Sequence, residues 1–138
     1  MRIAIHLDGL IVMLREDGVS RVYVGCPHTD PDPIRRRWRR DQATGVAASI
    51  LSARIPVFSP LTHFYPLIKE RPFFLDEWAL LMDASFWRPL NESFIRNWAD
   101  SLVIVGIPGW KQSRGLRHET DLSIELGHQV FLIGGENL

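Results

Sequence analysis

The feature that most constrains the fold is a succession of short apolar runs that alternate with longer amphipathic segments. The runs are too short for buried helices and are bounded by turn-forming residues, which is typical of buried strands. They span residues 19–24, 55–58, 102–106 and 129–133. The segments predicted to be helical span residues 33–53, 73–82, 91–98 and 113–126. Strands alternating with helices predict an α/β fold, in which a parallel sheet is covered on both faces.

The first twenty residues are expected to form an extension of this core. Asp8-Gly9 and Asp17-Gly18 separate short apolar runs, and Asp-Gly pairs supply the positive φ angles of tight hairpin turns. We therefore expect a β-meander over residues 1–20, whose last strand enters the main sheet, and a flavodoxin- or Rossmann-like core over residues 21–134. Both belong to a single domain of 138 residues. Residues 59–72, with three prolines, are expected to form a long connection.

Composition excludes several classes of protein. Sixteen Lys and Arg balance sixteen Asp and Glu, which argues against a general attraction to nucleic acid or to a membrane surface. The single cysteine excludes an internal disulfide framework and a four-cysteine zinc site. We therefore expect a cytoplasmic protein without a metal or another cofactor. The arginine-rich run at 35–40 is interpreted as a solvated face or a subunit contact, with a nucleic-acid contact as the alternative.

Parallel sheets of this kind bind ligands at the carboxyl ends of their strands. The loops nominated by this rule span residues 25–32, 59–66, 107–115 and 134–138. The third loop opens a predicted helix, where Ser113 suits the N-cap and Gly115 lets a ligand approach the backbone. Free amides at a helix start attract phosphate, and the carboxylate of Glu119 lies near this opening. It is placed to attack an electrophilic carbon, unless the segment is an ordinary capped helix with a solvated glutamate.

Further candidate residues follow the first two core strands. Tyr23 either aims its hydroxyl group into the cleft or packs in the core. Cys26 is interpreted as an inert thiol, since no base is identifiable beside it. Ser59 and His63 are candidates for binding sugar hydroxyls or phosphate. His63 and His28 do not predict a metal site, because no third ligand lies at suitable spacing.

These pieces together resemble the nucleoside 2-deoxyribosyltransferase-like superfamily, and in particular a branch of small proteins whose activity is not established. The shared motif is Pro-Gly-Trp-x-x-Ser-x-Gly-x-x-x-Glu at residues 108–119, with Ser113, Gly115 and Glu119 at its last three fixed positions. The resemblance covers about residues 20–134.

The resemblance implies cleavage or transfer at the N-glycosidic bond of a nucleoside or nucleoside 5′-monophosphate. It implies that Glu119 is the nucleophile, that Tyr23 orients it, and that Ser113 and Gly115 hold a 5′-phosphate. The other residues predicted to bind substrate are Gly25, Pro27, Ser59, His63 and Trp110. Members of the superfamily are often homo-oligomers whose active sites are completed by a neighbouring subunit, and Glu136 and Asn137 are candidates for that contact.

Asn91 departs from the family pattern, because it stands where members usually carry an aspartate near the base. An aspartic acid can protonate a leaving base, whereas an amide can only hydrogen-bond to it. Either Asp83 or a protonated substrate substitutes, or the protein is a non-catalytic nucleotide-binding module. Cleavage of the nicotinamide bond of NAD, which needs no acid, is a further alternative. The choice between hydrolysis and transfer stays open.

Overall fold

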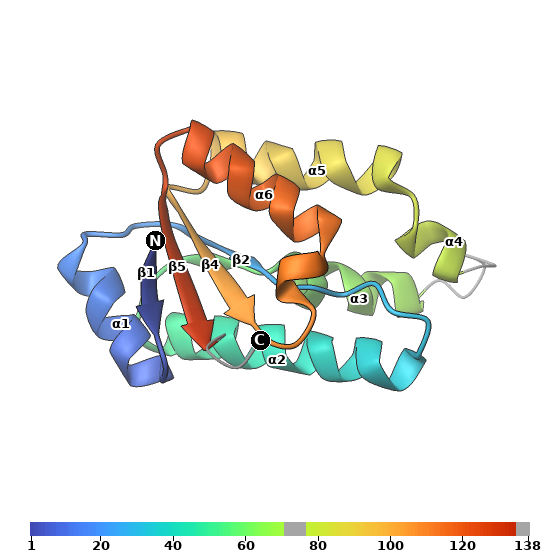
Figure 1. The fold of residues 1–138 in the computed structure, drawn as a ribbon, viewed down its shortest axis with the longest axis horizontal. Coiled ribbons are helices and arrows are strands. Elements are labelled where there is room, and N and C mark those ends of the chain that lie inside the picture. Colours follow the sequence, from blue (N-terminus) through green and yellow to red (C-terminus); the bar gives the residue numbers. More distant parts are fainter. Residues whose placement is uncertain (71–76, 135–138) are drawn as a thin grey trace.

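The computed structural model describes residues 1–70 and 77–134 and has an α/β architecture (Figure 1). One sheet contains β1 (Arg2–Ala4), β2 (Val22–Gly25), β3 (Val57–Phe58), β4 (Ser101–Gly106) and β5 (Gln129–Gly134). Its strand order is β1-β5-β4-β2-β3, and every pair is parallel. The helices are α1 (Leu7–Glu16), α2 (Pro33–Ser52), α3 (Pro60–Glu70), α4 (Glu77–Leu81), α5 (Ala84–Asn97) and α6 (Arg114–Glu125). The predicted fold class, a Rossmann-like parallel sheet flanked by helices, is confirmed.

Helices cover both faces of the sheet. Leu10 and Leu14 of α1 and Ile50 of α2 pack on one face, in a cluster with Val103 of β4. Residues of α5 and α6 pack on the other face, where these two helices lie side by side (Figure 1). Because both faces are covered, β2 and β4 are buried along their whole length, which explains their uninterrupted apolar sequences.

The chain reverses its direction of travel across the sheet between β2 and β4. From β2 it moves outward to β3, whereas from β4 it moves outward in the opposite direction to β5. The loops that leave β2 and β4 therefore diverge at the carboxyl ends of two paired strands. Such a switch point is where open α/β sheets bind ligands.

The β-meander predicted for residues 1–20 is wrong after its first strand. Residues Leu7–Glu16 form α1, with Leu10 and Leu14 fully buried. Gly9 tolerates this because the space around it is open, and Gly18, at φ 67°, lies just beyond the end of the helix. An Asp-Gly pair suits the end of a helix as well as a hairpin, because both need a residue with positive φ. The last strand of the predicted meander does enter the main sheet, as β2.

Two further expectations about helices are corrected. Residues 59–72 were expected to be a connection, yet α3 begins at Pro60, where the missing amide of a proline leaves no intrahelical bond unmade. The short helix expected at 91–98 begins earlier, at Ala84, so Asn91 lies inside α5 and cannot cap it. Within the predicted helix at 73–82, α4 accounts for Glu77–Leu81, and residues 73–76 lie outside the described residues.

The described helices include none that is both long and apolar enough to cross a bilayer.

Candidate active site

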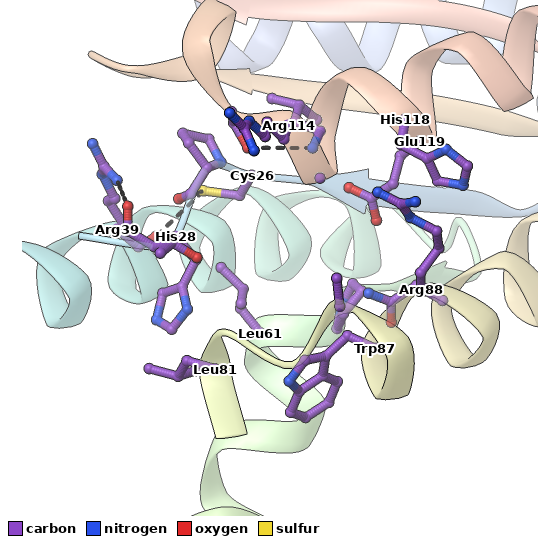
Figure 2. Close-up of a pocket in the computed structure, with 18 of the residues that line it drawn as sticks. Cys26, His28, Arg39, Leu61, Leu81, Trp87, Arg88, Arg114, His118 and Glu119 are labelled. Atoms are coloured by element: carbon purple, nitrogen blue, oxygen red, sulfur yellow. Dashed lines mark hydrogen bonds between the residues drawn. The ribbon is translucent and has the colours of Figure 1, made fainter. Parts of the chain in front are cut away.

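A cavity of about 650 Å³ opens at the switch point, beside the carboxyl ends of β2 and β4 (Figure 2). Its walls come from the loops that follow these strands and from α2, α3, α5 and α6. Apolar side chains of α3, α4 and α5, among them Leu61, Leu81 and Trp87, form part of the wall, and arginine, histidine and glutamate side chains from several elements, α5 included, converge on the same cavity. Such a combination of apolar wall and converging polar groups is typical of small-molecule sites.

Tyr23 and Glu119 meet at this cavity. Tyr23 is fully buried in β2, and its hydroxyl group donates a hydrogen bond to Oε2 of Glu119. The other carboxylate oxygen, Oε1, lies beside Gly25, at 3.6 Å from where a Cβ atom would stand. Glu119 itself lines the cavity. The structure thus brings together the two residues for which the resemblance implied a nucleophile and its orienting partner.

Burial sets the protonation of this pair. It raises the pKa of Glu119 to about 7, and the hydrogen bond from Tyr23 acts in the opposite direction by stabilising the carboxylate. Burial, followed by the charge and hydrogen bond of Glu119, raises the pKa of Tyr23 well above 10, so the phenol keeps its proton. Near neutral pH the site therefore holds a phenol donating to a carboxyl group that is close to half ionised. A carboxylate with its pKa near the working pH suits a reactive group better than a structural one.

The amino end of α6 forms the adjacent wall. Ser113 caps the helix by accepting a hydrogen bond from the amide of Leu116 at 3.2 Å. Ser113, Arg114 and Gly115 all line the cavity, and nothing lies within 4 Å of where a Cβ atom of Gly115 would stand. The approach to the first helical turn is therefore open, as phosphate binding to backbone amides requires.

Asn91 also lines the cavity, from the middle of α5. Its side-chain oxygen Oδ1 is buried and has no hydrogen-bond partner among the described residues. Asp83, the alternative proton donor, is exposed at the start of α5 and accepts a hydrogen bond from Ser85. Asp83 is not part of the cavity wall, so its position does not suit an acid that acts on a bound base.

Four of the predicted substrate-binding residues are not among those that line the cavity: Gly25, Ser59, His63 and Trp110. Ser59 is buried and accepts a hydrogen bond from the hydroxyl group of Thr62 at 2.9 Å. His63 is exposed, with its ring against Phe58. Trp110 packs against the core beneath α5 and α6. These side chains stabilise the loops of the site, whereas Pro27 lines the cavity itself.

Cys26 lines the cavity but is a poor nucleophile. Burial raises the pKa of its thiol to about 12, against a smaller opposing effect of the Arg39 charge. The thiol is directed at the backbone oxygens of Pro27 and Arg39, at 3.4 and 3.6 Å. The thiolate is the reactive form of cysteine, so this environment agrees with the inert thiol expected from the sequence.

The arginine-rich run is solvated only in part: Arg35 and Arg37 are exposed, whereas Arg36, Arg39 and Arg40 are each more than nine-tenths buried. The loop at 26–32 folds back over the start of α2 and supplies acceptors for these side chains. Arg39 donates to the backbone oxygen of Thr29 at 3.1 Å. The spacing of the arginines along the helix does not reveal that this loop covers them. Their burial was therefore not predicted from the sequence.

A histidine next to Glu119 was also missed. The ring of His118 is hydrogen-bonded through Nε2 to Glu92 of α5, and both residues line the cavity. Arg88 reaches from α5 in the direction of Glu119 (Figure 2). The position of His118 immediately before the motif glutamate was the available sequence signal. The described residues hold no cluster of three or more His, Cys, Asp or Glu side chains suited to a metal ion.

Comparison with known protein families assigns the sequence to one family. Residues 20–135 match the family described as a domain of unknown function (DUF1937). The chain belongs to the DUF1937 family. The match begins just before β2 and extends through β4 and α6, so it includes every residue that lines the cavity. No curated protein matches the sequence.

Proposed function

We propose that this DUF1937 protein cleaves or transfers at the N-glycosidic bond of a nucleoside or nucleoside 5′-monophosphate, with Glu119 as the nucleophile. The observation that carries the proposal is the carboxylate of Glu119, held by the buried Tyr23 at the edge of a cavity. The open amino end of α6 lies beside it. A sugar phosphate bound there would have its phosphate on the backbone amides and its anomeric carbon near the carboxylate.

The chemistry requires an oxygen of Glu119 to attack the anomeric carbon as its bond to the base nitrogen breaks. The base leaves with the electron pair of that bond, and the sugar becomes an ester of Glu119. Water, after losing a proton, then attacks the same carbon and releases the sugar and the free carboxylate. A second base in place of water would give transfer. Tyr23 keeps the carboxylate in position and lowers its pKa, which increases the ionised fraction that can attack.

The departing base needs a proton, and His118 is the group that suits this role. Asn91 has no acidic proton to give, and Asp83 is exposed at the start of α5. The ring of His118 lines the same cavity as Asn91, and its Nε2 atom is hydrogen-bonded to the carboxylate of Glu92, which orients the ring. Asn91 is then free to hydrogen-bond to the base. Protonation of a leaving group typically contributes about 10²–10⁴-fold to rate.

The test is to incubate the protein with a panel of nucleosides and nucleoside monophosphates and to measure free base by chromatography. Wild-type protein should release base, and Glu119→Gln should not. Glu125→Gln, an exposed substitution on the same helix, is the matched control and should keep full activity. His118→Gln should reduce release by about 10²–10⁴-fold. Equal release by wild type and Glu119→Gln would refute the nucleophile assignment.

A non-catalytic nucleotide-binding module is the second candidate. It is favoured by the unpartnered Oδ1 atom of Asn91, which could recognise a base without protonating it. This alternative predicts that a nucleotide raises the melting temperature while no free base forms. Any release of base that depends on Glu119 excludes it.

A further inference from the structure

Arg40 is a buried cation on the wall of the cavity. Arg40 is 8% exposed, and its Nη1 atom donates a hydrogen bond to Nε2 of His28 at 3.1 Å. The guanidinium group lies 3.4 Å from the centre of the Tyr65 ring. Burial and then the nearby arginines lower the pKa of His28 to about 4, so its ring is neutral at pH 7, and Tyr65 contacts the guanidinium group through the face of its ring. Neither of them neutralises the positive charge of Arg40.

The other buried arginines of α2 differ in this respect. Arg36 has a carboxylate oxygen of Glu77 at 3.9 Å, and Arg39 has one of Asp30 at 4.0 Å. Within the described ranges, no carboxylate lies at ion-pair distance from Arg40. A buried charge is costly unless it is paired, and stacking on an aromatic ring compensates only part of that cost. The missing counter-charge therefore points to an anionic ligand.

The position of Arg40 connects this cation to the proposed active site. Arg40 and His28 line the same cavity as Glu119. Their neighbour Arg39 donates to the backbone oxygen of Pro108, in the loop that leads to α6, at 3.2 Å. Figure 2 shows Cys26 between His28 on one side and Arg114 on the other. One wall of the cavity thus runs from the amino end of α6 past Cys26 and His28 to Arg40, so a ligand with one phosphate at α6 has room for a second phosphate toward Arg40.

We infer that Arg40 and His28 form a second anion subsite, which binds the outer phosphate of a nucleotide that carries a pyrophosphate group. The inference rests on the proposed function for the position of the sugar and of the first phosphate. It gives the substrate class as a nucleoside diphosphate or a dinucleotide, rather than a free nucleoside. His28 supplies a neutral ring and Arg40 the charge.

Titration calorimetry with ADP and AMP tests the subsite directly. Wild-type protein should bind ADP about tenfold or more tightly than AMP, because a charge-assisted hydrogen bond to the outer phosphate is gained. Arg40→Gln should bind the two nucleotides equally, and Arg40→Lys should keep part of the preference. Arg35→Gln removes the same charge from an exposed position of α2 that is outside the cavity wall, and should behave as wild type. Equal affinity of wild type for ADP and AMP overturns the inference without any variant, as does an unchanged preference in folded Arg40→Gln.

Inorganic pyrophosphate and NAD⁺ extend the experiment. Pyrophosphate should bind more tightly than orthophosphate, and this difference should also depend on Arg40. If ADP binds more tightly than NAD⁺, the subsite prefers the terminal phosphate of a nucleoside diphosphate. If the two bind equally, it accepts the internal pyrophosphate of a dinucleotide. Measuring ADP and AMP binding in Glu119→Gln, which should not release base, tests the anion subsite separately from the glycosidase activity. An Arg40-dependent preference with no base release from any nucleotide supports the subsite and refutes the glycosidase, whereas base release with no preference for ADP refutes the subsite alone.

Discussion

Replacing Glu119 with glutamine should stabilise the fold in a pH-dependent manner. The carboxyl group titrates near 4.5 when exposed and near 7 in the folded chain. The folded state therefore holds its proton more tightly than the unfolded state does. The free energy of unfolding that comes from this tighter proton binding is fully present below pH 4.5. It falls as the pH rises and is lost above about 7, where the carboxyl group is ionised in both states. Each pH unit between these values is worth about 1.4 kcal/mol, so the wild type should lose about 3 kcal/mol relative to Glu119→Gln.

Urea unfolding of both proteins between pH 4 and pH 8.5 measures this difference. Contributions of all other titrating groups cancel in the comparison, because the amide keeps the size of the side chain and can still accept the hydrogen bond of Tyr23. Glu125→Gln, at an exposed position of α6, is the matched control for the loss of a carboxylate from the same helix. A constant difference for Glu119→Gln across the range would mean that its carboxyl group titrates as an exposed one does. The electrostatic reasoning about the site would then fail.

Three other substitutions or treatments test the same site. Tyr23→Phe removes the donor that lowers the pKa of Glu119, so the ascending limb of the pH–rate profile should move to higher pH than in wild type, and an unmoved limb would contradict the role of Tyr23. Gly25→Ala would place its Cβ atom 2.6 Å from Cδ1 of Leu116, which should cost about 1–3 kcal/mol in urea unfolding; unchanged stability would show that the contact relaxes freely. The thiol of Cys26, with its pKa raised to about 12, should resist iodoacetamide at pH 8 in the folded protein and react readily in urea, and fast reaction of the folded protein would mean that the thiol is not shielded.

The core strands could be predicted from the sequence because burial on both faces requires consecutive apolar residues, which form a local pattern. The runs at 102–106 and, after Gln129, at 130–133 are uninterrupted by polar residues, and β4 and β5 occupy the predicted positions almost residue for residue. The N-terminal helix could not be predicted with the same ease. Its position depends on the parallel pairing of β1 with β5, in which Arg2 lies opposite Phe131. Parallel pairing requires a crossover rather than a hairpin, and no local pattern reveals which distant strand is the partner.

The candidate site was predictable to a similar extent. Tyr23 and Glu119 lie where strand ends and helix starts meet in a parallel sheet, so their approach follows from topology. The burial of Arg40 does not, because it depends on a loop that folds back over α2 and on a ring from α3. A run of arginines has the same sequence pattern whether it faces water or a cavity. Only the backbone around it decides between the two.

The first strand has a consequence for the family as a whole. The DUF1937 match begins at residue 20, after β1 and α1, yet β1 occupies the outer side of β5. Any relative without an equivalent segment would leave the backbone amides and carbonyls of its last strand available to another polypeptide. Such a protein could dimerise by joining two sheets into one, whereas in this chain the edge strand is β1, whose three residues offer a much shorter template for pairing.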